Sequence, residues 1–165
     1  NKFDKHIENK TLARNAKDTA KAIAQIDDTF CAACFDLQQV MMLPKASQYC
    51  LFYTRKLNNY NLSLYSLGSS DAHCYVWNEA VGGKGYCEVA SCVYDFIKSM
   101  AAKYVKSITT FSDNCAGQNR NRYFLTMLWY SLKTLHLDNV CHQYLERGHT
   151  QMILFIQLLR VPVNM

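Results

Sequence analysis

The chain of 165 residues has no internal repeat, no low-complexity run and no interdomain linker. These absences argue against repeat and multidomain architectures, and the length lies within the ~100–200 residues that are usual for one domain. The chain also lacks a signal peptide and an initiator methionine, since it begins with Asn1. We therefore expect one α/β domain that is a fragment or an excised part of a longer protein.

Charge and cysteine content set further limits. The net charge is only +5, a mild excess that permits nucleic-acid binding without requiring it. Eight cysteines without a signal peptide indicate reduced thiols in an intracellular protein rather than a disulfide framework. Cys31 and Cys34 have the spacing of zinc ligands, but alternation along a strand sends them to opposite faces, which disfavours a zinc site.

The segment around Asp113 is the most informative part of the chain. Residues 106–111 before it predict a short β-branched strand, and residues 123–137 after it predict an amphipathic helix. Asp113 therefore lies where a strand ends, which is where α/β sheets bind ligands and metals. A structural alternative is that Asp113 helps to form a turn and that Asn119 or Asn121 caps the helix. Capping and catalysis can coexist at a helix start.

Four polar side chains follow Asp113 in the loop or at the start of the helix. Arginine, asparagine and glutamine side chains can hold the phosphate or sugar oxygens of nucleic acids. The expected contact residues are Gln118, Asn119, Arg120 and Arg122.

A second carboxylate, Asp36, lies near the end of an apolar run, residues 29–37, which has the length of a buried strand. A charge in such a run is costly unless it is paired or binds a metal. If the two strands are neighbours, Asp36 and Asp113 form one site whose hard oxygen ligands suit Mg²⁺ or Mn²⁺. Clustered carboxylates repel each other, so at least one should have a raised pKa. The alternative is an aspartate that turns the chain after an edge strand.

The rest of the chain alternates strands and helices. Residues 8–26 predict a helix with a weak apolar face, which indicates a lead-in rather than a core element. Strand–helix–strand units favour parallel pairing with right-handed crossovers. The elements expected after the first strand are a hairpin of residues 60–67 and 72–79, a helix at 87–104, the strand before Asp113, the helix after it and a strand at 139–145.

This element order resembles the ribonuclease H-like fold of ribonuclease H and of DDE-type transposases and integrases. In that fold the first and fourth strands lie side by side and each carries a catalytic aspartate, and Asp36 and Asp113 match those positions. Several sequence blocks further resemble an uncharacterised family of transposon-derived proteins with a Ser-Asp-Asn-Cys-x-Gly-Gln-Asn motif. The blocks are residues 35–40, 76–79, 88–92, 112–121 and 148–151, and the resemblance covers residues 12–152.

The resemblance implies phosphodiester chemistry that depends on two Mg²⁺ or Mn²⁺ ions. Asp36 and Asp113 would then be catalytic residues and metal ligands. Glu88 is a third catalytic candidate, because ribonuclease H carries a glutamate on the corresponding helix; alternatively it is a favourable acid in a first helical turn. His149, in the Gly-His-Thr block, is a catalytic candidate that supports or binds the metal, or it is structural.

The match to this fold is incomplete at the C-terminus. The fold takes a further acid from the helix after the last core strand, whereas no residue after Glu146 is acidic. We expect a helical lead-in at residues 1–28, a ribonuclease H-like core at 29–152 and an atypical apolar tail at 153–165. The tail is too short for a transmembrane helix, which needs ~20 residues, so no membrane contact is expected.

The functional expectation is a degraded metal-dependent nuclease or transposase core with weak or no activity and with nucleic acid as its partner. A noncatalytic nucleic-acid-binding or scaffold domain and a nonfunctional gene fragment are the alternatives. The expected location is intracellular, with the nucleus included. The sequence does not indicate the oligomeric state or distinguish DNA from RNA.

Overall fold

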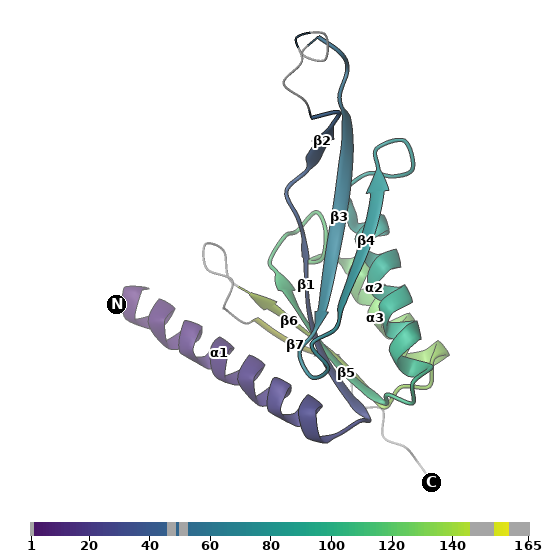
Figure 1. The fold of residues 1–165 in the computed structure, drawn as a ribbon. Coiled ribbons are helices and arrows are strands. Elements are labelled where there is room, and N and C mark those ends of the chain that lie inside the picture. The colour runs from purple at the N-terminus through teal and green to yellow at the C-terminus, as the bar shows by residue number, and fades with distance from the viewer. Residues whose placement is uncertain (1, 46–48, 50–52, 146–153, 159–165) are drawn as a thin grey trace.

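The computed structural model describes residues 2–45, 49, 53–145 and 154–158, and for residues 2–6, 8–10 and 154–158 it describes the backbone alone (Figure 1). The elements are α1 Lys2–Ile26, β1 Phe30–Leu37, β2 Met41–Leu43, β3 Leu57–Ser66, β4 Ala72–Asn78, α2 Tyr86–Ala101, β5 Ser107–Asp113, α3 Arg122–Thr134, β6 Asn139–Leu145 and β7 Leu154–Leu158. Among the helices in this part of the chain, none combines the length and the apolar character needed to cross a membrane.

The strands form one mixed, seven-stranded sheet in the order β4-β3-β1-β5-β6-β7, with β2 also paired to β3. β1 pairs in parallel with β5, and β5 pairs in parallel with β6. The other pairings are antiparallel. Helix α2 connects β4 to β5, and α3 connects β5 to β6. The predicted fold class, an α/β fold with a mixed sheet and crossover helices, is confirmed, and this strand order is compatible with a ribonuclease H-like sheet.

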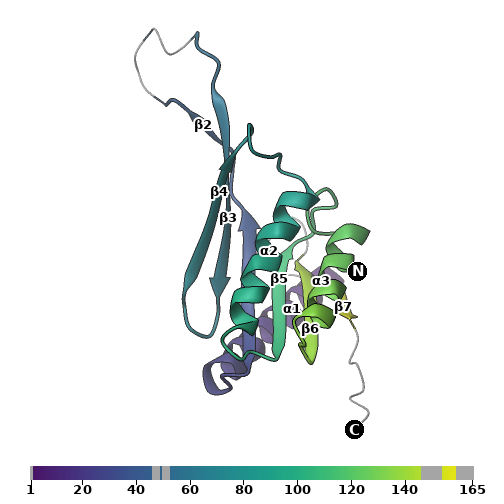
Figure 2. The same ribbon diagram turned by 90° about the vertical axis from the view of Figure 1, so that its right-hand side faces the viewer.

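Helices cover both faces of the sheet (Figures 1 and 2). α2 and α3 pack on one face over the larger hydrophobic core, which includes Phe35, Phe96 and Phe124. α1 packs on the other face, where Ala20 joins a smaller cluster around Phe111. The expected lead-in helix therefore contacts the sheet through a few alanines, whose small side chains let a weakly apolar helix approach the strands.

β1 is apolar on both faces because it lies between β3 and β5 at the centre of the sheet. Cys31, Ala33 and Phe35 contact the core under α2 and α3, whereas Ala32 and the half-buried Cys34 face α1. A continuous apolar run is typical of such a central strand. The two cysteines are thus on opposite faces, and burial raises the pKa of the Cys31 thiol to about 11, which disfavours the thiolate that binds zinc.

Two short strands lie outside the sequence-based expectations. β2 has three exposed residues and forms because the chain after β1 continues alongside β3. β7 falls within the segment expected to be an apolar tail, and it pairs antiparallel with β6. β5 is also longer than expected and includes Asp113, because that residue pairs with Leu145 of β6.

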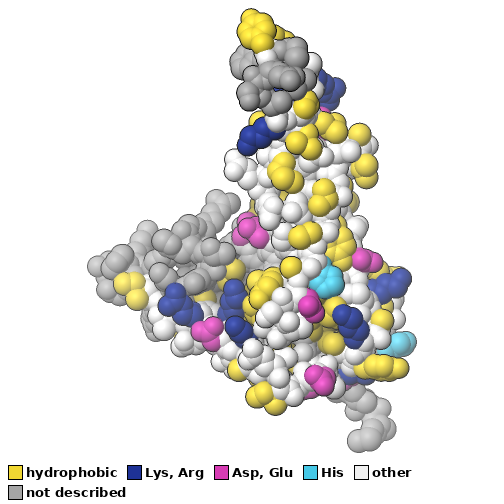
Figure 3. Space-filling model, viewed as in Figure 1, with side chains coloured by type: hydrophobic (Ala, Val, Ile, Leu, Met, Phe, Trp, Pro, Cys, Tyr) yellow, Lys and Arg dark blue, Asp and Glu magenta, His cyan; other side chains and the backbone are white. Residues whose placement is uncertain are grey.

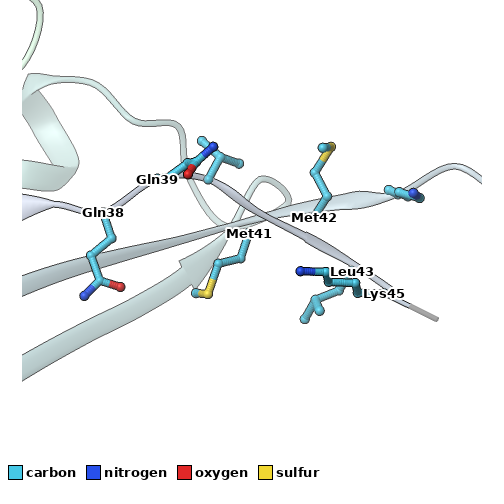
Figure 4. A pocket seen from close by; sticks show the side chains of 8 residues that line it. Gln38, Gln39, Met41, Met42, Leu43 and Lys45 are labelled. Carbon is cyan, nitrogen blue, oxygen red and sulfur yellow. The ribbon is translucent and has the colours of Figure 1, made fainter. Parts of the chain in front are cut away.

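β2 and the facing part of β3 form an arm that projects from the rest of the sheet (Figures 1 and 2). Met41, Met42 and Leu43 are exposed on this arm, and hydrophobic side chains lie among polar ones over this part of the surface (Figure 3). A hollow of about 690 Å³ runs along β2 and is lined by residues 38–43, 45 and 56. Figure 4 shows Met41 and Met42 on opposite sides of the strand, as the two-residue period requires. Neither predicted catalytic aspartate lines this hollow.

Gly68 lies where α1 meets the turn between β3 and β4. A Cβ atom at this position would lie 2.5 Å from the carbonyl oxygen of Ala24 and 2.9 Å from its Cβ. Because a helix backbone cannot move aside as a flexible side chain can, Gly68→Ala should lower the free energy of unfolding by about 1–3 kcal/mol.

Gly117→Ala is the matched control, since a Cβ at Gly117 meets no atom within 4 Å. Its effect should stay within about 0.5 kcal/mol. Urea unfolding followed by circular dichroism measures both variants, and equal stabilities would contradict the close contact between Gly68 and α1.

Candidate functional site

Asp36 and Asp113 lie side by side at the carboxyl ends of β1 and β5. Cys34 pairs with Phe111 in the parallel register, and each aspartate follows two residues later on its own strand. The two-residue period of a strand therefore puts both carboxylates on the face that Cys34 and Phe111 share with α1. The prediction that these two strands are parallel neighbours is confirmed.

The two carboxylates repel each other. The pKa of Asp36 is raised above its ordinary value, first by partial burial and second by the negative charge of Asp113, while a hydrogen bond from the Leu37 backbone acts in the opposite direction. The predicted raised pKa is thus confirmed. A raised pKa means that the ionised Asp36 destabilises the folded protein at neutral pH, and that this cost disappears as the pH falls and the carboxyl gains its proton.

The loop after β5 holds Asp113 in place. Asn119 is buried, its Nδ2 donates a hydrogen bond to Asp113 Oδ1 at 2.8 Å, and its Oδ1 accepts one from the Cys115 backbone N at 3.1 Å. The Tyr144 hydroxyl of β6 donates to the carbonyl oxygen of Asn119 at 2.8 Å. Asn119 therefore positions Asp113, and its buried side chain is not accessible for the direct contact with nucleic acid that the sequence suggests.

The structural alternative for this loop holds as well. Asn121 Oδ1 accepts a hydrogen bond from the Phe124 backbone N at 3.0 Å and so caps α3. Its Nδ2 donates to the carbonyl oxygens of Ala116 and Gln118 at 3.3 Å and 3.2 Å. The helix cap and the presentation of Asp113 are therefore two properties of one loop.

The other expected nucleic-acid contacts are accessible in different degrees. Arg120 and Arg122 are exposed, and Gln118 is half-buried. All three belong to the loop after β5 or to the first residue of α3, so they lie at the same edge of the sheet as Asp113. Two positive charges are thus accessible to an anionic ligand at this edge.

A buried histidine that no sequence motif marks lies on the opposite face of β5. His142 of β6 is fully buried, with its Nδ1 2.7 Å from Thr110 Oγ1 and its Nε2 3.1 Å from Ser112 Oγ. Ser112 Oγ in turn donates to the carbonyl oxygen of Asp113 at 3.0 Å. Burial lowers the pKa of His142 to about 3, so the ring is neutral at physiological pH. A lone histidine within an apolar strand gives no sequence signal of this role.

Glu88 lies at the start of α2, as expected, but it is engaged elsewhere. Its Oε1 accepts a hydrogen bond from the Gly83 backbone N at 2.8 Å, and its side chain lines a hollow of about 420 Å³ with Trp77 and Cys87. α2 packs on the face opposite to the two aspartates, which explains the separation. Over the part of the chain that the structure describes, no group of three or more His, Cys, Asp or Glu side chains is arranged to hold a metal ion. His149 lies outside the described residues.

Asp36 and Asp113 are the side chains at the carboxyl edge that could hold a hard cation. Mg²⁺ is usually bound through one or two protein carboxylates and keeps several waters, and Asp36 and Asp113 supply two carboxylates. Asn114, next to Asp113, has a buried Oδ1 that accepts no hydrogen bond within the described structure. Amide oxygens are also suitable ligands for hard cations. Two carboxylates with such an amide oxygen nearby in the chain could supply ligands for one Mg²⁺ or Mn²⁺ ion, and a second ion would need further ligands.

The neutral state of His142 predicts how stability depends on pH. The pKa of His142 in the folded protein, about 3, lies below the ordinary value of 6.5. Its contribution to the free energy of unfolding is therefore fully present above pH 6.5 and is lost as the pH falls. Between pH 6.5 and pH 5 the free energy of unfolding should decrease by up to about 1.4 kcal/mol per pH unit. Urea unfolding at several pH values measures this slope.

His142→Gln should reduce this slope while lowering the overall stability, since glutamine does not titrate in this range. His136→Asn is the control, because His136 is exposed and follows α3 with φ of 52°, a conformation that asparagine tolerates. A slope that is the same in the wild type and in His142→Gln would show that another group causes the pH dependence.

Comparison with protein-family models, with curated proteins and with solved structures gave no match to this chain. The resemblance to transposon-derived proteins therefore stays a prediction from the motifs. The function is inferred from the side chains that the fold brings together at the carboxyl edge of β1 and β5.

Proposed function

We propose that this chain is a transposase-derived, ribonuclease H-like domain that binds nucleic acid and one Mg²⁺ or Mn²⁺ ion at Asp36 and Asp113. The observation that carries the proposal is the parallel pairing of β1 with β5, which brings two mutually repelling carboxylates to one edge. A cation bound between them would relieve this repulsion.

The side chains at the edge that carries Asp36 and Asp113 have separate roles in this proposal. Asp36 and Asp113 hold the cation, and the hydrogen bond from Asn119 keeps one Asp113 oxygen in a fixed orientation. The exposed guanidinium groups of Arg120 and Arg122 bind phosphate oxygens at the same edge. A bound cation supplies Lewis-acid polarisation of a phosphate oxygen and a lower pKa for a coordinated water.

We expect weak catalysis at most. Two-metal phosphodiester cleavage needs ligands for both ions, and Glu88 is turned toward Gly83. The absence of a third suitably placed acidic or metal-binding side chain among the described residues favours the alternative of a noncatalytic nucleic-acid-binding domain. The two functions share the edge of the sheet that carries Asp36 and Asp113, the acidic edge, and they differ in whether a phosphodiester bond is broken.

Metal binding is expected to raise the melting temperature. At a Mn²⁺ concentration ten times the Kd, mass action stabilises the fold by about 1.4 kcal/mol, which corresponds to roughly 3–6 °C for a domain of this size. Asp113→Asn should abolish the shift, because it removes one ligand and the repulsion that the cation offsets. The response should also fade as the pH falls and Asp36 gains its proton.

Asp138→Asn is the matched control, since Asp138 is an exposed acid just before the amino end of β6, at the opposite end of the strands. This variant should keep the full response to Mn²⁺ in differential scanning fluorimetry. Equal shifts in the wild type and in Asp113→Asn would rule out the acidic edge as the metal site.

Cleavage activity is expected to be close to background. Labelled single-stranded, double-stranded and RNA–DNA hybrid substrates, incubated with Mn²⁺ and resolved on denaturing gels, measure it, with Asp36→Ala as the control. Robust cleavage that disappears in Asp36→Ala would contradict weak catalysis and would mean that Glu88, Glu146 or His149 completes the site. Binding without any cleavage dependent on Asp36 would support the noncatalytic alternative.

A further inference from the structure

Two tyrosine rings stack where α2 and α3 begin. The ring centroids of Tyr86 and Tyr123 are 4.4 Å apart, and the ring planes differ by only 12°. Tyr86 is the first residue of α2, and Tyr123 is the second residue of α3. The rings therefore form an aromatic stack that bridges the two helices at their first turns, and the outer sides of the stack are left for a ligand.

The strand directions put this aromatic stack at the same edge as the acidic pair. β4 is antiparallel to β3, and β3 is antiparallel to β1, so β4 points in the same direction as β1 and β5. α2 follows β4 and α3 follows β5, so both helices begin at the carboxyl edge where Asp113 lies. The loop that presents Asp113 leads through the Asn121 cap directly into Tyr123.

Arg122 adds a positive charge to this stack, and Tyr123 is exposed whereas Tyr86 is half-buried. The guanidinium carbon of Arg122 lies 4.9 Å from the centroid of the Tyr123 ring, and its Nη2 donates a hydrogen bond to the Tyr123 hydroxyl at 2.9 Å. Tyr123 is 47% exposed, whereas its neighbour Phe124 is completely buried in the core. The Tyr123 side chain is thus accessible to a ligand, as Phe124 is not.

A second tyrosine pair joins the same two helices further along. The rings of Tyr94 and Tyr130 are 5.8 Å apart and tilted by 42°, and Tyr130 is 51% exposed. This pair shares the residue types, the helices and the exposure of the first pair, but it lacks the parallel stacking, the arginine and the position at the carboxyl edge. It is therefore an internal control for the effect of simply linking α2 to α3.

We propose that Tyr86 and Tyr123, with Arg122, form a stacking platform for an unpaired nucleobase of a single-stranded nucleic acid. Stacked aromatic rings beside a guanidinium group bind any base through its π-face, while the positive charge attracts the adjoining phosphate. In a duplex both faces of each base are already stacked, so the platform selects unpaired strands or ends. The proposal rests on the proposed function for the class of ligand, and it names the form of nucleic acid that reaches the acidic edge.

The experiment measures binding by fluorescence anisotropy of labelled 20-nucleotide DNA and RNA single strands and of the matching blunt duplexes. EDTA is present, so the result does not depend on the metal site. Tyr123→Ala should weaken single-strand binding by about fivefold or more, as expected for the loss of one stacking ring. Tyr123→Phe keeps the ring and should stay within about twofold of the wild type.

Tyr130→Ala is the matched control and should also stay within about twofold. Tyr123→Leu keeps an apolar contact between the helices without an aromatic face, and it should show the same loss as Tyr123→Ala. Thermal melts of all variants report folding. Photocrosslinking of a strand that contains 5-bromouracil, followed by mass spectrometry, should identify Tyr86 or Tyr123 as the attached residue.

Three outcomes would overturn the proposal: equal losses in Tyr123→Ala and Tyr130→Ala, an equal loss on single strands and duplexes, or crosslinks confined to other parts of the chain. Single-strand binding that depends on Tyr123, in a protein whose melting does not respond to Mn²⁺, would keep the platform and refute the metal site. Strand binding that does not change when Tyr123 is replaced, in a protein whose melting temperature responds to Mn²⁺, would refute the platform and keep the metal site.

Discussion

The parallel pairing of β1 with β5 is the constraint on which the rest of this structure depends. It places an apolar strand at the centre of the sheet, between helices on both faces, and side chains of this strand enter both hydrophobic clusters. The same register brings Asp36 and Asp113 together where both strands end. Hydrophobic burial thus stabilises an arrangement whose electrostatics are unfavourable, as the raised pKa of Asp36 indicates.

The hydrogen bonds around Asp113 explain how this arrangement is maintained. On one side Asn119 fixes the Asp113 carboxylate and is itself fixed by Tyr144. On the other side Ser112 and His142 hold the backbone of the same strand. These contacts come from β6 and from the loop before α3, so the acidic edge is supported by the neighbouring parallel strand rather than by solvent-exposed side chains.

The sequence predicts the features that follow from hydrophobic periodicity and from the order of the elements. It does not predict the features that depend on which side chains are buried. Apolar runs and helical spacing identify the main strands and crossover helices, and strand order predicts the adjacency of Asp36 and Asp113. The pattern does not reveal that Asn119 is buried, because its environment depends on Tyr144, 25 residues later in the chain. The sequence also places Glu88 at the start of a helix. It does not indicate which face of the sheet that helix covers, because this depends on tertiary packing. β2 and β7 are too short or too uniform in composition to show the two-residue alternation of polar and apolar side chains that predicts a strand.

The hydrogen-bond distances around His142 select one tautomer of its ring. Ser112 Oγ donates its proton to the Asp113 carbonyl, so it can only accept from Nε2–H, and Nδ1 then accepts from Thr110 at 2.7 Å. The opposite tautomer would make Thr110 donate to the Cys141 carbonyl at the longer distance of 3.4 Å. The bonds therefore run in one direction, from Thr110 through the imidazole to the peptide group of Asp113. A backbone shift at Asp113 would remove the acceptor of Ser112 and favour the other tautomer, with its longer bond from Thr110 to Cys141, so the position of the Asp113 peptide group is coupled to a proton deep within the core.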